Sequence, residues 1–214
     1  MSDSLNAALA RHDIELDEEL IAPLQQYCEV MWEWNEKLNL TRHTDYERFA
    51  TRDVKDCLEL SKLLGEAELV LDVGSGGGVP GIVLAILRPD LQVALCESVQ
   101  KKAAVLADMT QQLSLPITVF PERAEVCVAT YGYDTLVARA VGPLWKMLKW
   151  FEPHWGSFGR LLAIKGPRWV KERGEARHRG FLKGLELRRM ATYTMIGTES
   201  DSVILQIRAR SDRR

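Results

Sequence analysis

The chain has 214 residues and a formal net charge of −2 at pH 7; 46% of its residues are hydrophobic and 27% are charged. This length and composition suit a globular protein with one α/β domain and an additional segment, or with two small domains, rather than a low-complexity chain. The near-zero net charge argues against a uniformly basic nucleic-acid binder, and no apolar run is long enough to span a membrane.

Cysteine and histidine are too dispersed to indicate a metal site. The four cysteines include no CxxC pair, and the four histidines include no HxxxH or HxH pair. We therefore expect no metal and no disulfide framework, but buried free thiols in a reducing cytoplasm. The N-terminus is acidic and amphipathic rather than signal-like, which agrees with a cytoplasmic protein.

The first predicted elements are two amphipathic helices. From about residue 17 to 38, apolar residues recur at helical spacing, and Asp17 can serve as the N-cap. A second such stretch, 45–64, ends at Gly65, a residue suited to a helix C-cap. We expect residues 1–65 to form a helical N-terminal segment packed on the rest of the chain, residues 66–214.

After residue 65 the pattern changes to strands that alternate with helices, which favours a parallel sheet. The predicted strands are 69–73, 92–96, 117–120, 135–138 and 160–164, and the predicted helices are 80–87, 100–113, 124–129 and 144–151. Two further strands, around 185–196 and 202–208, are separated by GTESD and predict an antiparallel hairpin. The expected fold is therefore a mostly parallel, doubly wound α/β sheet with an antiparallel edge.

Charge is unevenly distributed along the chain. Residues 1–70 contain 16 acidic and 7 basic residues, whereas residues 160–190 contain 10 basic and 3 acidic residues. A chain that is neutral overall can carry one basic face that binds phosphates. A solvated helix surface explains the same run equally well, so both interpretations stay open.

The most informative stretch, LVLDVGSGGGVPG at 69–81, runs from a strand into a loop with five glycines in eight residues. Glycines permit positive φ and remove the Cβ atoms that would keep a ligand away from the backbone. Such a loop, between the carboxyl end of a strand and a helix, is where open α/β sheets bind nucleotides.

Spacing within and beyond the loop separates the nucleotide classes. A dinucleotide fingerprint needs its third glycine at the position of Val79, and no Lys-Ser or Lys-Thr pair follows to make a P-loop. The second predicted strand ends in Glu97, whose carboxylate can accept both hydroxyls of an adenosine ribose. Val79 therefore disfavours an NAD-linked dehydrogenase, and Glu97 favours an adenosine-containing ligand.

The pattern Asp72-x-Gly74-x-Gly76-x-Gly78, with Glu97 one strand later, resembles the class I S-adenosylmethionine-dependent methyltransferases. The resemblance implies their Rossmann-like fold and S-adenosylmethionine as the cofactor, with S-adenosylhomocysteine as its product. The loop glycines and Glu97 are then expected to contact the cofactor, and Asp72 suits its ammonium group. The alternatives are a turn or cap role for Asp72 and a surface position for Glu97.

The chain lacks the residues that several other acceptors require. Methylation of a pyrimidine C5 needs a cysteine nucleophile, whereas the candidate, Cys127, is expected on a short helix as a structural thiol. Exocyclic amines are usually methylated beside Asn/Asp-Pro-Pro-Tyr, where this chain has VARAVGPL at 137–144. Ring nitrogen N7 of guanine is already a lone-pair nucleophile, so N7 chemistry is compatible with this absence without being proved by it.

Four local signatures together resemble the bacterial ribosomal RNA small subunit methyltransferase G family, which methylates N7 of a guanine in 16S rRNA. They are WNEKLNLT at 34–41, LDVGSGGGVPGI at 71–82, RA at 139–140 and LLAIKG at 161–166, and their order fits from about residue 20 to 208. The resemblance implies that the partner is 16S rRNA or a precursor of the small ribosomal subunit. We also expect a monomer that acts in the cytoplasm without a metal.

The resemblance also assigns roles to individual residues. The family's cofactor contacts carry over to Gly74, Val79, Ala124, Glu125 and Arg139. The expected RNA contacts are Asn39, Arg52, Arg139, Lys165 and Arg168, with the basic segment 168–189 gripping phosphates. No residue is expected to act as nucleophile or base, so Arg139 and Lys165 would position the substrate.

Each of these assignments has a structural alternative. Ala124 and Glu125 can form an ordinary helix N-terminus, and Arg139 can form a structural salt bridge. Asn39 can cap a turn, and Arg52 can be a surface residue.

The chain departs from the family pattern in three places. Arg-His-x-x-Asp-Ser is replaced by RDVKDC at 52–57, Ser-Leu-x-Lys-Arg by SVQKK at 98–102, and Glu-His-Arg by ESDS at 199–202. These differences concern the RNA side rather than the cofactor loop. Two other functions therefore stay open: methyl transfer to another acceptor, and a non-catalytic rRNA-binding or assembly protein on the same fold.

Overall fold

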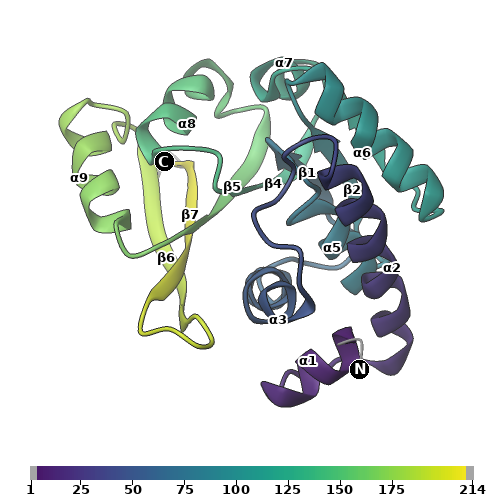
Figure 1. Cartoon of the computed structure of the whole chain (residues 1–214). Coiled ribbons are helices and arrows are strands. Elements are labelled where there is room, and N and C mark those ends of the chain that lie inside the picture. The colour runs from purple at the N-terminus through teal and green to yellow at the C-terminus, as the bar shows by residue number, and fades with distance from the viewer. Residues whose placement is uncertain (1–3, 211–214) are drawn as a thin grey trace.

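The computed structural model describes residues 4–210 and places one seven-stranded sheet between helices (Figure 1). The strand order is β3-β2-β1-β4-β5-β7-β6. The first five strands are parallel, and β7 is antiparallel to both β5 and β6. Their bounds are β1 Leu69–Val73, β2 Gln92–Cys96, β3 Thr118–Phe120, β4 Tyr133–Arg139, β5 Phe158–Lys165, β6 Leu185–Thr194 and β7 Asp201–Ala209.

The predicted fold class is confirmed, because the sheet is mostly parallel and ends in an antiparallel hairpin. The order reverses between β1, which leads toward β2 and β3, and β4, which leads toward β5. Side chains and loops at the carboxyl ends of β1 and β4 therefore border the crevice in which doubly wound sheets bind ligands. The glycine loop follows β1 and lies at this point.

Most of the predicted helices are present in the structure. The helices are α1 Leu5–Arg11, α2 Glu18–Asn35, α3 Tyr46–Arg48, η1 Phe49–Val54, α4 Lys55–Ser61, α5 Gly81–Leu87, α6 Gln100–Gln112, α7 Ala124–Thr130, α8 Leu144–Trp150, η2 Glu152–His154 and α9 Trp169–His178. The predicted helix 45–64 is divided, and its middle part, η1, is a π-helix. Helix α9, inside the basic segment, was not predicted.

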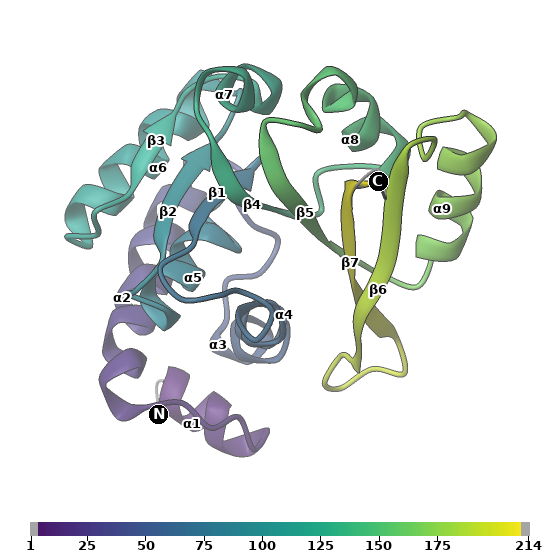
Figure 2. The same ribbon diagram turned by 180° about the vertical axis from the view of Figure 1, so that it is seen from behind.

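Two hydrophobic clusters cover the two faces of the sheet. Strand residues alternate between them: Val70 of β1 belongs to the first cluster, whereas Leu71 and Val73 belong to the second. The first cluster includes residues of α1, α2, α4, α5 and α6, and the second includes residues of α7, α8 and α9. Figure 2 shows this arrangement from behind, with α2 and α9 at opposite sides of the molecule.

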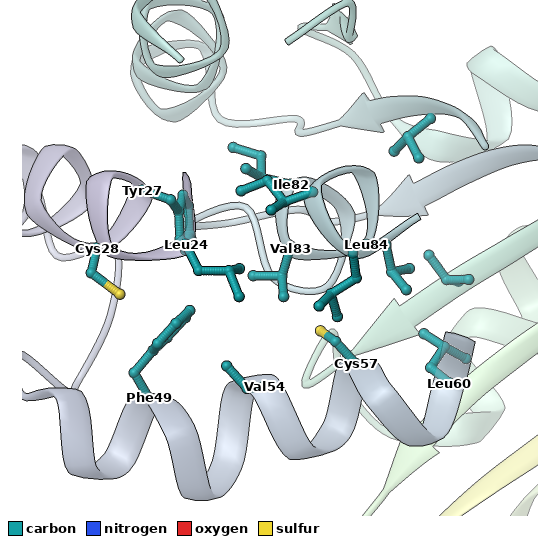
Figure 3. Packing of buried hydrophobic residues seen from close by; sticks show 14 of the residues in the cluster. Leu24, Tyr27, Cys28, Phe49, Val54, Cys57, Leu60, Ile82, Val83 and Leu84 are labelled. Carbon is teal, nitrogen blue, oxygen red and sulfur yellow. The ribbon is translucent and has the colours of Figure 1, made fainter. Parts of the chain in front are cut away.

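Helix α5 explains how the N-terminal helices join the sheet. Its sequence, GIVLAIL, is apolar all round, which requires burial on every side. Figure 3 shows Ile82, Val83 and Leu84 of α5 between side chains of α2 and side chains of the helix that carries Phe49 and Val54. The helices before residue 65 thus share a core with the sheet, which keeps the 40–53 region above the glycine loop. The domain boundary at residue 65 stays a prediction.

All four cysteines are buried and none is in a disulfide. Within residues 4–210, no helix combines the length and the apolar character that a membrane crossing needs.

Candidate functional site

The glycine loop is held against the end of β2 by hydrogen bonds. The amides of Gly74 and Ser75 donate to the carbonyl of Cys96 at 2.8 and 3.2 Å. The Ser75 hydroxyl donates to the carbonyl of Asp72 at 3.0 Å and accepts from the amide of Cys96 at 3.2 Å. Gly74 and Gly76 have φ values of +67° and +57°, which disfavour any side chain. The loop is therefore a fixed turn that joins two strand ends.

The loop glycines have different roles. A Cβ atom on Gly76 would meet nothing closer than the Gly74 carbonyl oxygen at 3.8 Å, so this position opens onto free space. A Cβ atom on Gly78 would lie 2.6 Å from Cδ1 of Ile82, and Gly78 is buried. Gly78 is thus needed for the packing of α5 against the loop, and its predicted contact with the cofactor is corrected to this structural role.

A pocket of about 570 Å³ opens above the loop, at the carboxyl ends of β1, β2 and β4. It brings together residues from α2, the 40–43 segment, η1 and three strand ends. The lining residues are Tyr27, Met31, Leu40, Thr41, Arg42, His43, Arg52, Asp53, Gly74, Ser75, Gly76, Gly77, Val79, Glu97, Lys102, Arg139 and Ala140. Its size is that of a small-molecule site.

Glu97 faces the glycine loop, as predicted, and is not a surface acid. Its side chain is 7% exposed and lines the pocket. One carboxylate oxygen accepts from the Gly76 amide at 3.0 Å, and the other accepts from the Val99 amide at 2.8 Å. Each oxygen keeps a further lone pair, so the carboxylate can still accept hydroxyl groups of a ligand in the pocket.

Asp72 does not face the pocket. It is fully buried, and its Oδ2 accepts from the Gly81 amide at 3.0 Å, at the beginning of α5. Burial raises the pKa of Asp72 to about 7, although the hydrogen bond from Gly81 lowers it. The expectation that Asp72 meets a ligand's ammonium group is therefore replaced by the alternative role, a carboxylate that fixes the turn into α5.

A second, smaller hollow lies on the other side of Gly74. It has a volume of about 90 Å³, and its lining includes Ala124 and Glu125 at the beginning of α7, together with Gly74 and Val141. Gly74 lines both hollows, and a Cβ atom there would lie 3.0 Å from Cγ1 of Val141. The predicted contacts at Ala124 and Glu125 are thus placed across the loop from Glu97.

Arg139 reaches the pocket from the end of β4 and is also part of a buried ion-pair network. Its Nε lies 3.0 Å from Oδ2 of Asp56, and its Nη2 pairs with Asp53. The hydroxyl of Tyr193 donates to the other oxygen of Asp56 at 2.7 Å. Burial acts to lower the pKa of Arg139, but the carboxylates of Asp53 and Asp56 outweigh it and raise that pKa. Arg139 therefore lies in the crevice, as predicted, and also forms the structural salt bridge that was the alternative role.

Of the predicted RNA contacts, Arg52 is exposed and lines the pocket, whereas Asn39 is exposed outside the lining. The turn that follows Asn39 is held by a different side chain, because Oδ1 of Asn35 accepts from the amides of Leu40 and Thr41 at 2.8 and 2.9 Å. Asn39 therefore does not serve as the cap that its alternative role required.

Lys165 and Arg168 lie outside the pocket lining. Lys165 is only 8% exposed; its ammonium group pairs with Glu172 of α9 at 2.9 Å and donates to the carbonyl of Gly142. This geometry ties α9 to the loop after β4, and Glu172 and the Gly142 carbonyl already occupy the ammonium group that was predicted to contact RNA. Arg168 is exposed and immediately precedes α9.

Sequence reasoning missed several residues of the pocket. Tyr27 is on the buried face of α2, and its hydroxyl donates to the Gly77 carbonyl at 2.8 Å. His43 and Lys102 also line the pocket. Burial lowers the pKa of His43, which favours its neutral form. No local motif marks these residues, because only the packing of α2 and the 40–43 segment over the loop brings them to the site.

Asp53 was noticed only as a departure from a family motif, yet it pairs with Arg139. Within residues 4–210, no group of three or more His, Cys, Asp or Glu side chains is arranged to hold a metal ion.

Comparison with known families identifies a match. The family described as rRNA small subunit methyltransferase G (GidB) matches residues 20–197 of this chain. A protein with the name ribosomal RNA small subunit methyltransferase G from Rhodopirellula baltica is 55% identical over 188 residues, which are 88% of this chain and 81% of that protein. A protein of the same name from a Ruegeria species is 33% identical over 92% of this chain and 96% of its own length.

Solved structures with a similar fold are far more distant in sequence. A variant of MtNAS in complex with S-adenosylmethionine has a TM-score of 0.61 at 15% identity, over 97% of this chain and 84% of that chain. TrmK from M. capricolum, in complex with S-adenosylhomocysteine, has a TM-score of 0.57 at 11% identity, over 73% of this chain and 68% of that chain. At such identities the likeness concerns the fold alone.

Proposed function

The chain belongs to the rRNA small subunit methyltransferase G family, and from this membership we propose that it transfers a methyl group from S-adenosylmethionine to N7 of a guanine in 16S rRNA. Its fold is the Rossmann-like fold of the class I S-adenosylmethionine-dependent methyltransferases. Family membership alone does not fix which guanine atom is methylated, or whether the substrate is free 16S rRNA or a ribosomal particle. Both assignments are parts of the proposal.

The residues present fit this cofactor. The open space at Gly76, together with the Glu97 carboxylate beside it, is the observation that carries the proposal. Glu97 would accept the ribose hydroxyls, while Ala124 and Glu125 would contact the adenine on the other side of Gly74. Gly76 and Val79 would leave room for the methionine portion along the loop.

When bound, S-adenosylmethionine supplies an electrophilic methyl group on a sulfonium sulfur. The chain's own residues then need to hold the guanine in line with that methyl group and exclude water. N7 of guanine carries a lone pair and no proton, so no side chain has to act as a base. Arg139, held by Asp53 and Asp56, would present a guanidinium group of fixed orientation to the base.

On the RNA side, we propose that Arg52 contacts the substrate at the rim of the pocket, with Asn39 and Arg168 as outer contacts. Lys165 is proposed instead as a positioning residue, because its ion pair with Glu172 joins α9 to the loop after Arg139. The partner is 16S rRNA or a small-subunit precursor, and we propose that a monomer acts on it in the cytoplasm.

Two measurements test the proposed function. Calorimetry with S-adenosylhomocysteine should detect binding that Glu97→Ala weakens, since the variant loses the carboxylate beside the loop. Glu59→Ala, on α4 and outside both hollows, is the matched control. No binding at millimolar ligand would favour the alternative, a non-catalytic rRNA-binding or assembly protein.

The second measurement is mass mapping of 16S rRNA from a strain that lacks this enzyme, before and after incubation with the purified protein and S-adenosylmethionine. The proposal expects one guanine to gain a methyl group at N7. Binding of the cofactor product without any methylated rRNA would mean that the acceptor is another molecule.

A further inference from the structure

A hollow of about 370 Å³ lies between α9 and the hairpin, away from the pocket above the glycine loop. Leucines and a glycine form its apolar part, and the remaining residues are all cationic. The lining consists of Arg173, Arg177, Gly180, Leu182, Lys183, Leu185, Leu187 and Arg210. We refer to these residues as the basic pocket. Four positive charges and no carboxylate surround one cavity.

The four cations of the basic pocket differ from their neighbours in having no acidic partner. Nearby, Arg179 pairs with Glu175, and Arg188 and Arg208 share Glu186. Within residues 4–210, no carboxylate lies within ion-pair distance of the cations that line the basic pocket. The acidic residues of this region thus form ion pairs with other cations, and no acidic side chain neutralises the positive charge of the basic pocket.

The fold fixes two of these cations. The guanidinium carbon of Arg173 lies 5.2 Å from the centre of the Trp169 ring, and Nε of Arg210 donates to the Leu185 carbonyl at 3.1 Å. Arg173 and Arg177 are four residues apart on α9, so two like charges share one face of the helix. These cations repel one another, and no acidic side chain neutralises them. Such a group of cations suits a ligand that supplies negative charge.

The basic pocket lies at the opposite end of the sheet from the cofactor site. Leu161, near the beginning of β5, pairs with Ile207 near the end of β7, whereas Lys165, at the carboxyl end of β5, pairs with Val203. Arg210 follows the end of β7 and Leu185 begins β6, so both belong to the end where β5 starts. Figures 1 and 2 agree that α9 lies beside this end of the hairpin, on the side of the molecule opposite α2.

We propose that the basic pocket binds backbone phosphates of the RNA substrate at a second, remote site. Guanidinium groups bind phosphate oxygens through bidentate hydrogen bonds, and the leucine side chains have no acceptor that would compete with phosphate for the guanidinium N–H groups. Because the basic pocket lies at the opposite end of the sheet from the pocket above the glycine loop, it engages a part of the RNA other than the nucleotide at Arg139. The identity of that RNA rests on the proposed function, whereas the phosphate chemistry does not.

The test uses the full chain and a fluorescently labelled, single-stranded oligouridylate, which has phosphates but no rRNA structure. Anisotropy titrations at several KCl concentrations give the slope of log K against log salt, which falls in magnitude by about 0.7 for each phosphate contact that is lost on a single strand. The double variant Arg177→Gln/Lys183→Gln should lower the slope by about 1.4. Both residues are exposed and form no ion pair, so the fold should be preserved.

Arg179→Gln is the control, because it removes one positive charge, as each of the two substitutions does, at a residue next to α9 that is paired with Glu175 and lies outside the lining. It should leave the slope unchanged, and all variants should bind S-adenosylhomocysteine like the wild type. An unchanged slope in the double variant, a slope lowered by about 0.7 in Arg179→Gln, or no salt-dependent RNA binding by the wild type would each overturn the proposal.

A further experiment distinguishes RNA from a small anion as the ligand of the basic pocket. If inorganic phosphate raises the melting temperature of the wild type but not of the double variant, while the RNA slopes are equal, the pocket binds a free anion and the RNA assignment is wrong. If the slopes differ as expected but no rRNA is methylated, the basic pocket stands and the proposed function fails.

Discussion

Cations lie at or beside both the pocket above the glycine loop and the basic pocket, but they differ in whether acidic side chains neutralise them. Arg139, which lines the first pocket, and Lys165, which lies outside its lining, are both largely buried; Arg139 pairs with Asp53 and Asp56, and Lys165 pairs with Glu172. In the basic pocket, Arg177 and Lys183 are exposed and unpaired. Buried cations need partners, because an uncompensated buried charge is strongly destabilising, whereas exposed cations are solvated until a ligand arrives. The buried, paired cations hold neighbouring elements in position, whereas the exposed, unpaired cations are available to attract an anionic ligand.

The largest expected effect comes from breaking the Arg139 network. Arg139→Met leaves Asp53 and Asp56 buried without their counter-charge, and this should lower the free energy of unfolding by about 3 to 5 kcal/mol. Arg177→Met, the same change in the basic pocket, should alter it by less than about 0.5 kcal/mol. Urea denaturation of both variants measures the difference.

Adding Asp53→Asn and Asp56→Asn to Arg139→Met should restore part of the stability, since the buried negative charges are then absent. Equal losses in the two single variants would show that the two kinds of cation do not differ.

The second effect concerns Asp72, the buried acid beneath the glycine loop. With its pKa raised to about 7 by burial, folding favours the protonated form, and stability should fall as pH rises from about 4 to about 7, by at most about 4 kcal/mol. Below pH 4 both states are protonated, and above pH 7 both are ionised, so the contribution is constant there.

Asp72→Asn keeps an oxygen that can accept from the Gly81 amide and should remove this dependence, flattening the profile of unfolding free energy between those pH values. Urea denaturation across the range, with the wild type beside the variant, is the measurement. An identical pH profile in both would mean that Asp72 does not titrate in this window. The basic pocket has no acidic lining, so substitutions there should leave the profile as it is.

The third effect is on ligand affinity alone. Gly76→Ala places a methyl group in the open space of the cofactor pocket at a positive φ, and binding of S-adenosylhomocysteine should weaken more than about tenfold, or 1.4 kcal/mol. Gly197→Ala, in the hairpin turn, is the control: it has φ +74° and open space, so it adds similar backbone strain away from both sites. If both variants kept full affinity by calorimetry, the loop would be only a turn.

The last effect separates positioning from RNA contact at Lys165. Lys165→Met removes the partner of Glu172 and should lower the free energy of unfolding by about 1 to 3 kcal/mol, while the salt dependence of oligouridylate binding stays unchanged. A slope reduced by about 0.7 in a folded variant would instead place Lys165 on the RNA, as its sequence context suggested.

Sequence patterns predicted best those features that depend only on residues close together in the chain. The bounds of β1 and β2 were predicted to the residue, because short apolar runs between turns define strands. The glycine loop and Glu97 were also predicted, since a tight turn next to a ligand needs glycines wherever it occurs. Helix α9 was missed, because its charged sequence has little apolar periodicity and it is buried mainly at Ala176.

Roles that depend on contacts between distant residues could not be predicted. Gly78 belongs to the same motif as Gly76, yet only the position of Ile82 makes it a packing residue. Tyr27 has the spacing of an ordinary core residue of α2, but its hydroxyl meets the loop fifty residues later in the chain.

By itself, the sequence determined the order of the strands along the chain, the glycine-rich turn after β1 and the excess of positive charge after residue 160, because each follows from the residues of a single segment. Only the tertiary structure decided which cations are neutralised and which are free. Asp53, Asp56 and Glu172 come from other elements than the cations they neutralise, and an ion pair forms only where packing brings the two charges together.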